Sequence, residues 1–418
     1  MQKLGGAVIL MQPNLNNDNN EILNKLSILV GSKSSISEAS YAYAKKPFDE
    51  HIIEFLNKIS QILMGKKESK AYPDIVTLGF WIRKSSMMKL KEKYDFTDSN
   101  IHIGRGVVFH IAPSNVPVNY AYSLFTGLIM GNANIVRIPS KDFPQVKIIN
   151  DAINQALEEF DDLRPYVNLV RYDRNTAIND YFSSISDVRV VWGGDATIAE
   201  LRKSAIPPRA TEITFADRYS LAVIDSDEYL SVENKSRIAN DFYNDTFLTD
   251  QNACTSPRIV VWTGNKIEEA KKEFWENLYS LVKTKYTFQP IMGINKLTSS
   301  YMAAAVIGGT KVEKTNDNMI VRVKLDKVCS DIMEFKDNSG YFFEYDCKDI
   351  LELKDLCNNT HCQTIGFLGN KDAIFPLISS GIKGVDRVVP IGKTMDFDFI
   401  WDGYNLCERL TRTIAVGV

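Results

Sequence analysis

Apolar residues recur along this chain in two different rhythms. In the first hundred residues they follow helical spacing, as at Ile52, Ile53, Leu56, Ile59 and Leu63, which predicts amphipathic helices. From about residue 106 onward, short β-branched runs alternate with helical patterns instead. The change of rhythm predicts a helix-rich segment over residues 1–100, followed by α/β structure.

The α/β part begins with five predicted strands, at residues 106–112, 134–138, 166–171, 187–192 and 220–225. Helical patterns lie between them, at 118–130, at 144–160 and from about 196. This alternation predicts a parallel sheet covered by helices on both faces, which is typical of a Rossmann-type domain, here over residues 101–226. Ligands of such sheets bind beyond the carboxyl ends of the strands.

The alternation of helix and strand patterns resumes after about residue 226, with a helix predicted at 230–247, a strand at 258–262 and a helix at 266–285. A second α/β domain is therefore expected over residues 227–385, followed by a C-terminal segment, 386–418. A polar stretch at residues 249–257 separates the helix at 230–247 from the strand that follows it.

Composition narrows the function classes. A hydrophobic share of 44%, a charged share of 24% and a net charge of −3 are ordinary for a soluble globular protein and argue against a nucleic-acid or membrane-surface partner. The apolar run Gly5–Met11 is too short for a membrane span and makes a poor signal peptide, so we expect a buried strand or packing segment there and a cytoplasmic protein. The six cysteines include no CxxC pair, and neither a disulfide framework nor a metal site is expected.

Four segments carry candidate chemistry. Cys254 lies in the polar stretch, where a nucleophilic thiol would be exposed and where Arg258 could lower its pKa; the alternative is a buried structural cysteine. Asn115 lies between two prolines after a predicted strand, either as part of a common turn or as a donor to an oxyanion. The other two segments follow strands as well.

Arg137 lies near the end of the strand at 134–138, and Ser140 follows it. A basic residue with a hydroxyl at this place is suited to a ribose 2′-phosphate, although an arginine at the solvated edge of the sheet is the simpler interpretation. Gly193 and Gly194 form a turn between strand and helix that would let backbone approach a phosphate or nicotinamide; a plain tight turn is the alternative. His110 is predicted to be packed, and the role of His361 is left open.

Taken in order, these segments resemble the LuxC-like acyl-CoA reductase (fatty-acid reductase) family, a divergent branch of the aldehyde dehydrogenase superfamily. The resemblance covers residues 100–418 and is carried by residues 106–117 (GVVFHIAPSNVP), 131–137 (GNANIVR), 191–195 (VWGGD), 250–257 (DQNACTSP), 363–366 (QTIG), 386–392 (DRVVPIG) and 401–403 (WDG).

The resemblance implies an aldehyde-dehydrogenase-like α/β fold, a cofactor domain and a catalytic thiol domain, with the C-terminal segment returning to the cofactor or oligomerisation region. Cys254 matches the acylated nucleophile and Asn115 the oxyanion-hole residue. Arg137 and Ser140 fall near the element that holds the adenosine ribose, with a spacing one residue longer here. Gly193 and Gly194 fall on the turn near the pyrophosphate and nicotinamide.

Phe215 occupies the position at which the superfamily's aldehyde oxidisers carry a water-activating glutamate. A reductase must keep its acyl-enzyme from being hydrolysed, so the resemblance implies reduction of an acyl thioester to an aldehyde with NADPH, or alternatively NADH. It further implies a coenzyme A or carrier-bound substrate, an acyl-activating synthetase as partner, and self-association. A cysteine-dependent acyl transferase or hydrolase, an acyl-phosphate reductase and a non-catalytic scaffold are the alternatives. The sequence does not specify the acyl chain.

Overall fold

The computed structural model describes residues 21–94, 96, 99–328 and 330–417, so the segment Gly5–Met11 lies outside the described residues. The described chain divides into two compact units. The first runs up to Phe215 and takes up the chain again from Cys407, and the second comprises Ala216–Leu406. The division after Phe215 therefore falls about ten residues before the boundary expected near residue 226, and the segment 386–418 is shared between the units.

The first unit contains a six-stranded sheet in the order β1-β5-β4-β3-β6-β7. The strands are β1 (Ser27–Val30), β3 (Val107–Ile111), β4 (Ala133–Arg137), β5 (Val167–Arg171), β6 (Val188–Trp192) and β7 (Thr211–Phe215). Only β1 is antiparallel to its neighbour, and the other pairings are parallel. The strand order reverses direction between β3 and β6, which makes this the switch point where doubly wound sheets bind ligands.

Four helices connect these strands: α6 (Asn119–Ile129), α7 (Pro144–Leu157), α8 (Thr176–Ser184) and α9 (Asp195–Leu201). The predicted strands and helices of this region are confirmed, with ends that differ by a few residues. All residues of β3 and β6 are buried, as expected for strands covered on both faces. Pro144 opens α7 at a position where its missing N–H is no loss.

The helices expected in the first hundred residues are α2 (Lys33–Ala39), α3 (Glu50–Gly65), α4 (Pro73–Trp81) and α5 (Lys84–Lys93), with the short 3₁₀ helix η1 (Glu68–Ala71). The helix α3 begins at the cap Asp49, whose carboxylate accepts from two backbone N–H groups, and its apolar face is buried. It packs against α4, α5 and α7 of the same unit. A two-stranded sheet, β2 (Ile101–Gly104) with β17 (Thr411–Ile414), and η2 (Asp161–Tyr166) complete the unit.

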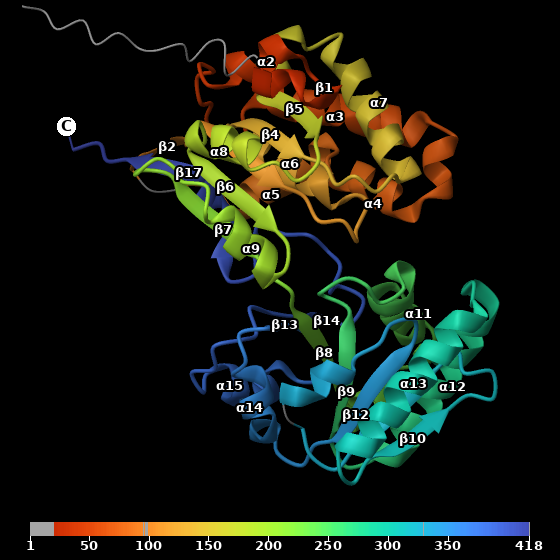
Figure 1. Cartoon of the computed structure of the whole chain (residues 1–418). Helices are drawn as coiled ribbons and strands as arrows, with labels where there is room; N and C mark the ends of the chain where they lie inside the picture. Colours follow the sequence, from red (N-terminus) through yellow and green to blue (C-terminus); the bar gives the residue numbers. More distant parts are fainter. Residues whose placement is uncertain (1–20, 95, 97–98, 329, 418) are drawn as a thin grey trace, which may run out of the picture. The chain divides into compact units, whose positions relative to one another are not determined.

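The second unit contains a seven-stranded sheet in the order β10-β11-β12-β9-β8-β13-β14 (Figure 1). Its strands are β8 (Tyr219–Asp225), β9 (Pro257–Thr263), β10 (Lys311–Lys314), β11 (Val321–Leu325), β12 (Tyr341–Asp346), β13 (Cys362–Leu368) and β14 (Arg387–Pro390). Only the edge strand β10 is antiparallel to its neighbour. Alternate residues of these strands lie in two separate hydrophobic cores. Leu221 and Val261 belong to one core, and Ala222 and Trp262 belong to the other. Burial on both faces explains why these strands read as continuous apolar runs.

The helices of this unit are α10 (Ser226–Ser231), α11 (Lys235–Thr246), α12 (Ile267–Lys285), α13 (Pro290–Val306), α14 (Lys354–Cys357) and α15 (Lys371–Ile378), with η3 (Phe247–Thr249), η4 (Ser330–Phe335) and η5 (Ile350–Leu353). The single helix predicted at 230–247 is wrong in its start, because Asn234 caps a new helix by accepting from the Arg237 N–H. The pair β15 (Ile400–Trp401) and β16 (Tyr404–Asn405) precedes α16 (Leu406–Leu410). No helix within the described ranges has the length and apolar character that a membrane crossing needs.

Candidate functional site

Cys254 lies in a tight loop between the 3₁₀ helix η3 and the strand β9. Two successive residues of this loop, Asp250 (φ 51°) and Gln251 (φ 60°), adopt the left-handed conformation that non-glycine residues rarely take. The Cys254 carbonyl accepts a hydrogen bond from the Ser220 hydroxyl at 2.8 Å, which ties the loop to the start of β8. The loop is therefore held in one defined conformation.

Gln251 fixes this loop to the sheet. Its buried amide nitrogen donates to the carbonyl oxygens of Pro257 and Tyr341, both at 2.9 Å. Its amide oxygen accepts from the backbone N–H groups of Gly340 and Tyr341 at 3.0 and 3.2 Å. One side chain thus satisfies backbone groups on both sides of the cysteine-bearing loop. Sequence reasoning gave Gln251 no role, although it stands within a quoted motif.

The surroundings of Cys254 favour a protonated thiol. Burial, followed by the negative charge of Asp402, raises the pKa of the Cys254 thiol to about 12, while a hydrogen bond with the Gln363 side chain acts in the opposite direction. Arg258 donates to the Asp337 carbonyl at 2.5 Å and to Asn338, whose amide in turn donates to Asn252 of the loop. A Cys254 thiolate acts to raise the pKa of Arg258, so the expected attraction between the two groups is present, but burial outweighs it and the net shift of the thiol pKa is upward.

A buried polar cluster stands beside the thiol. Gln363, on β13, donates through its amide nitrogen to Asp402, which lies in the β15–β16 turn. Arg218 Nε lies 3.6 Å from the second carboxylate oxygen of Asp402, and Arg218 Nη1 lies 3.1 Å from Asp386. Burial raises the pKa of Asp402 to about 6. Both Gln363 and Asp402 belong to motifs that the sequence singled out, but nothing in the sequence indicated that they meet.

His361 lies just ahead of β13. Its Nδ1 is 2.7 Å from the Asp217 carbonyl oxygen, and its own carbonyl accepts from the Tyr219 N–H. These contacts place His361 against Asp217 and Tyr219, at the start of β8. The side chain that forms a hydrogen bond with the thiol is that of Gln363, on β13.

In the first unit, Asn115 and the glycine turn follow the two strands of the switch point. Asn115 is exposed on the segment between β3 and α6, and Gly193 and Gly194 lead from β6 into α9. A Cβ built on Gly194 would meet no heavy atom within 4 Å, and one on Gly193 would lie 3.1 Å from Thr197. The space beside Gly194 is thus unobstructed, and contact of this turn with a cofactor stays a prediction.

Arg137 and Ser140 follow β4, the next strand along. The Arg137 guanidinium stacks over the Tyr172 ring at 4.7 Å and donates to the Tyr172 carbonyl at 3.3 Å. Its Nε is buried and has no hydrogen-bond partner among the described residues, and Ser140 is exposed. The pair brings a guanidinium and an exposed hydroxyl to the carboxyl edge of the sheet, which fits an anionic ligand.

A buried network supports the same edge. His110 lies 2.8 Å from the Ser123 hydroxyl and 3.0 Å from Asn134 Oδ1, and burial lowers the pKa of His110 to about 4. The prediction that His110 is packed is confirmed. The Trp192 indole also donates to Ser123, and Phe215 stacks on Trp192 with ring centroids 3.7 Å apart.

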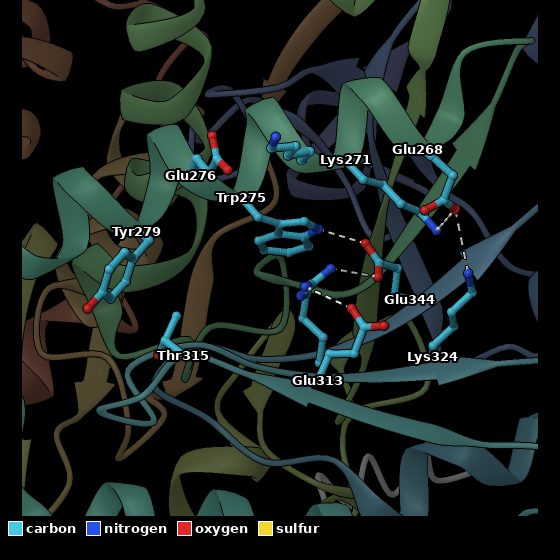
Figure 2. Close-up of a pocket in the computed structure, with 11 residues that line it drawn as sticks. Glu268, Lys271, Trp275, Glu276, Tyr279, Glu313, Thr315, Lys324 and Glu344 are labelled. Atoms are coloured by element: carbon cyan, nitrogen blue, oxygen red, sulfur yellow. Dashed lines mark hydrogen bonds and ion pairs between the residues drawn. The ribbon is translucent and has the colours of Figure 1, made fainter.

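A separate cavity of about 350 Å³ lies in the second unit (Figure 2). It is lined by Glu268, Lys271, Lys272, Trp275, Glu276, Tyr279, Glu313, Thr315, Arg322, Lys324 and Glu344. Arg322 bridges Glu313 and Glu344 at 2.9 and 3.0 Å, and the Trp275 indole donates to Glu344 at 2.7 Å. Most of its charged side chains neutralise one another, and none of the candidate residues lines it. Across the described part of the chain, no group of three or more His, Cys, Asp or Glu side chains is placed to hold a metal ion.

Comparisons with solved structures show the fold. A salicylaldehyde dehydrogenase from Pseudomonas putida G7 superposes with a TM-score of 0.64 at 13% identity, over 95% of this chain and 89% of that one. A 1-pyrroline-5-carboxylate dehydrogenase from Thermus with bound NAD gives 0.61 at 11% identity, over 100% and 99%. The predicted aldehyde-dehydrogenase-like α/β fold is confirmed.

Comparisons with curated proteins point to a narrower group. A long-chain acyl-protein thioester reductase from Vibrio harveyi is 27% identical over 230 residues, which are 52% of this chain and 45% of that protein. The chain spans less than half the length of the curated relatives it matches. The family model described as acyl-CoA reductase (LuxC) matches residues 82–413. Because this match covers most of the sequence, the chain belongs to the LuxC family of acyl-CoA reductases.

Proposed function

We propose that this protein reduces an acyl thioester to an aldehyde with NADPH, through an acyl group carried on Cys254. The observation that carries the proposal is a cysteine held in a strained polar loop, in contact with the Gln363 amide, in a chain of the LuxC family. The Vibrio harveyi relative is named as an acyl-protein thioester reductase, which supports the same reaction class.

Cys254 is the nucleophile in this proposal. Its thiolate attacks the thioester carbonyl, forms a new carbon–sulfur bond and expels the thiol of coenzyme A or of a carrier protein. The Cys254 backbone N–H and the Asn115 amide are proposed to stabilise the negative oxygen that develops, a contribution typically worth about 10²–10³ in rate for each donor. Collapse of the thiohemiacetal on Cys254 releases the aldehyde and returns the thiolate.

The cofactor is proposed to bind at the carboxyl edge of the first unit's sheet. When bound there, reduced nicotinamide dinucleotide supplies the hydride. The unobstructed backbone at Gly194 suits a pyrophosphate, and the Arg137 guanidinium with the exposed Ser140 hydroxyl suits a ribose phosphate, which favours NADPH. A Thermus dehydrogenase of the same fold carries NAD. Phe215, stacked on Trp192, presents no group that could activate water against the acyl-enzyme.

The acyl donor and the partners are also proposals. The relatives' name favours a protein-bound acyl group, which an acyl-activating synthetase would supply, and coenzyme A thioesters are the second donor class. Self-association is proposed from the resemblance alone.

The test measures NADPH and NADH oxidation with acyl-CoAs from acetyl to palmitoyl and with an acylated carrier protein. Wild type is compared with Cys254→Ala and with Cys347→Ala, a control whose buried thiol contacts the Asp349 carbonyl instead. Oxidation and acyl labelling that vanish only in Cys254→Ala are expected. Labelling that persists in Cys254→Ala would overturn the assignment, and thiol release without oxidation in wild type would point to an acyl transferase.

A further inference from the structure

Asp245 stands at an unusual place for a carboxylate. It lies in the last turn of α11, where the helix dipole disfavours negative charge, and only 1% of the residue is exposed. The basic residues Arg237 and Lys393 pair with Asp241 and Asp396 instead. Burial is the largest cause that raises the pKa of Asp245, to about 7. A buried carboxylate without an ion-pair partner needs an explanation in the hydrogen bonds that it accepts.

Both carboxylate oxygens of Asp245 bind the same segment, residues 392–394. Oδ2 accepts from the Gly392 N–H at 2.6 Å, and Oδ1 accepts from the Thr394 N–H at 3.1 Å. Gly392 has φ 89°, and a Cβ there would lie 2.6 Å from the Asp241 Cβ, so the close approach to α11 requires glycine. An ionised carboxylate can accept both bonds, whereas a protonated one must use one oxygen as a donor. The grip on this segment therefore belongs to the ionised form.

The gripped segment continues to the loop that carries the cysteine. Thr255, which follows Cys254 and is 2% exposed, donates its hydroxyl to the Met395 sulfur at 3.1 Å. A thioether is a weak acceptor, so this bond depends on Met395 being held in place from behind. The helix α11 itself leads through η3 into the cysteine loop. Asp245, Met395 and Thr255 thus close a ring of contacts around that loop.

We propose that Asp245 is a positioning residue for Cys254: its ionised carboxylate holds residues 392–395 so that Met395 meets Thr255 and keeps the cysteine loop closed. Protonation of Asp245, or loss of its charge by substitution, frees the segment and loosens the loop. The inference rests on the proposed role of Cys254 as the nucleophile, but it concerns the loop before any substrate binds.

The grip and the stability of the fold depend on pH in opposite directions. The pKa of Asp245 is higher than its ordinary value of 3.8, so the folded protein binds this proton more tightly than the unfolded chain does. The stability that this group contributes therefore falls as the pH rises from about 4 to about 7. The grip on residues 392–394 forms as the pH rises through the same pKa. Asp245 thus serves the position of the loop at a cost in stability.

Other groups must be separated from Asp245 in a pH experiment. The charged side chains on the segments around it include those of Arg237, Asp241, Lys285, Lys393 and Asp396. Elsewhere in the unit, burial is the largest cause that brings the pKa of Asp402 to about 6 and that of Lys296 to about 7. The effect is therefore assigned by comparing variants at two pH values, rather than from the shape of one profile.

The experiment measures how fast Cys254 exchanges with 4,4′-dithiodipyridine in the full-length protein without substrate or cofactor, followed by mass spectrometry of the Cys254 peptide. Asp245→Asn should react about tenfold faster than wild type at about pH 8.5, the loss of one hydrogen bond that keeps the loop closed. At about pH 5.5 the two rates should agree within about twofold, because Asp245 is then protonated in wild type as well. Asp241→Asn removes a charge one turn earlier on α11 and should match wild type at both pH values.

Met395→Leu breaks the same ring at its other end. It removes the sulfur that accepts from Thr255 and nearly keeps the side-chain volume, so it should show the same pattern and serves if Asp245→Asn does not fold. Adding Asp245→Asn to it should change the rate little further. An acceleration of equal size at both pH values, or none in either variant, would overturn the inference. Failure of the proposed function is a different result: the expected exchange rates in a protein that oxidises no NADPH with any acyl donor.

Discussion

The two units share one architecture but use opposite edges of it. Each has a largely parallel sheet with one antiparallel edge strand. In the first unit, the candidate residues follow the carboxyl ends of β3, β4 and β6. In the second, they stand at the amino ends: Cys254 precedes β9, and Gln363 lies near the start of β13. The same scaffold therefore offers two chemically different edges.

The difference has an electrostatic cause. Helices that connect parallel strands run against them, so helix N-termini gather at the carboxyl edge and helix C-termini at the amino edge. The carboxyl edge of the first unit suits phosphates, in keeping with the Arg137 guanidinium at the end of β4. The amino edge of the second unit does not favour anions in this way, and burial, the largest cause, raises the pKa values of Cys254 and Asp402. The candidate cofactor residues therefore lie at the carboxyl edge of one sheet, and the protonated thiol of Cys254 lies at the amino edge of the other.

The largest expected effect that tests this comparison comes from the first unit. If Asn115 donates to the developing oxyanion, Asn115→Ala should lower kcat by about 10²–10³, with little change in the KM for NADPH. Ser114→Ala, the neighbouring exposed position, is the control and should stay near wild type. Steady-state rates with one acyl-CoA measure both. A rate within twofold of wild type for Asn115→Ala would restrict the first unit to cofactor binding.

Gln251→Leu tests how firmly the amino edge holds its loop. The substitution leaves four backbone groups without their partner, two of them carbonyls and two N–H groups, and should lower the free energy of unfolding by about 2–3 kcal/mol. Gln289→Leu makes the same chemical change at an exposed residue and should cost less than about 0.5 kcal/mol. Urea unfolding of the two variants gives the comparison, and equal stabilities would show that the loop is held by other contacts.

The sequence predicted the first unit better than the second, because a rule exists for what lies at the carboxyl edge of a parallel sheet. Strands such as β3 and β6 are short, fully buried and separated by helices, so their periodicity is plain and the rule for carboxyl ends then places Asn115 and Gly194. Cys254 was identified by its polar setting and by resemblance. No comparable rule exists for the amino edge of a sheet.

Gln363 and Asp402 could not be paired from the sequence. Their contact depends on a register shift in β13 and on the left-handed conformation of Asp402, and neither is a property of one local pattern. The Asp-Gly dipeptide does predict a tight hairpin, and that signal was present. The dipeptide does not indicate in which direction the aspartate side chain points, because tertiary packing decides that direction.

The smallest expected effect concerns cofactor choice at the carboxyl edge. Arg137→Met removes the guanidinium at the end of β4, and should raise the KM for NADPH about tenfold, the loss of one charge-assisted hydrogen bond. The KM for NADH should change less than twofold, because that cofactor has no 2′-phosphate. Arg171→Met, at the end of the neighbouring strand β5, is the matched control, since Arg171 already pairs with Asp142 at 2.7 Å. Equal losses with both cofactors would mean that Arg137 supports the sheet edge through Tyr172 rather than reading the phosphate, and the comparison between the two edges would then rest on the glycine turn alone.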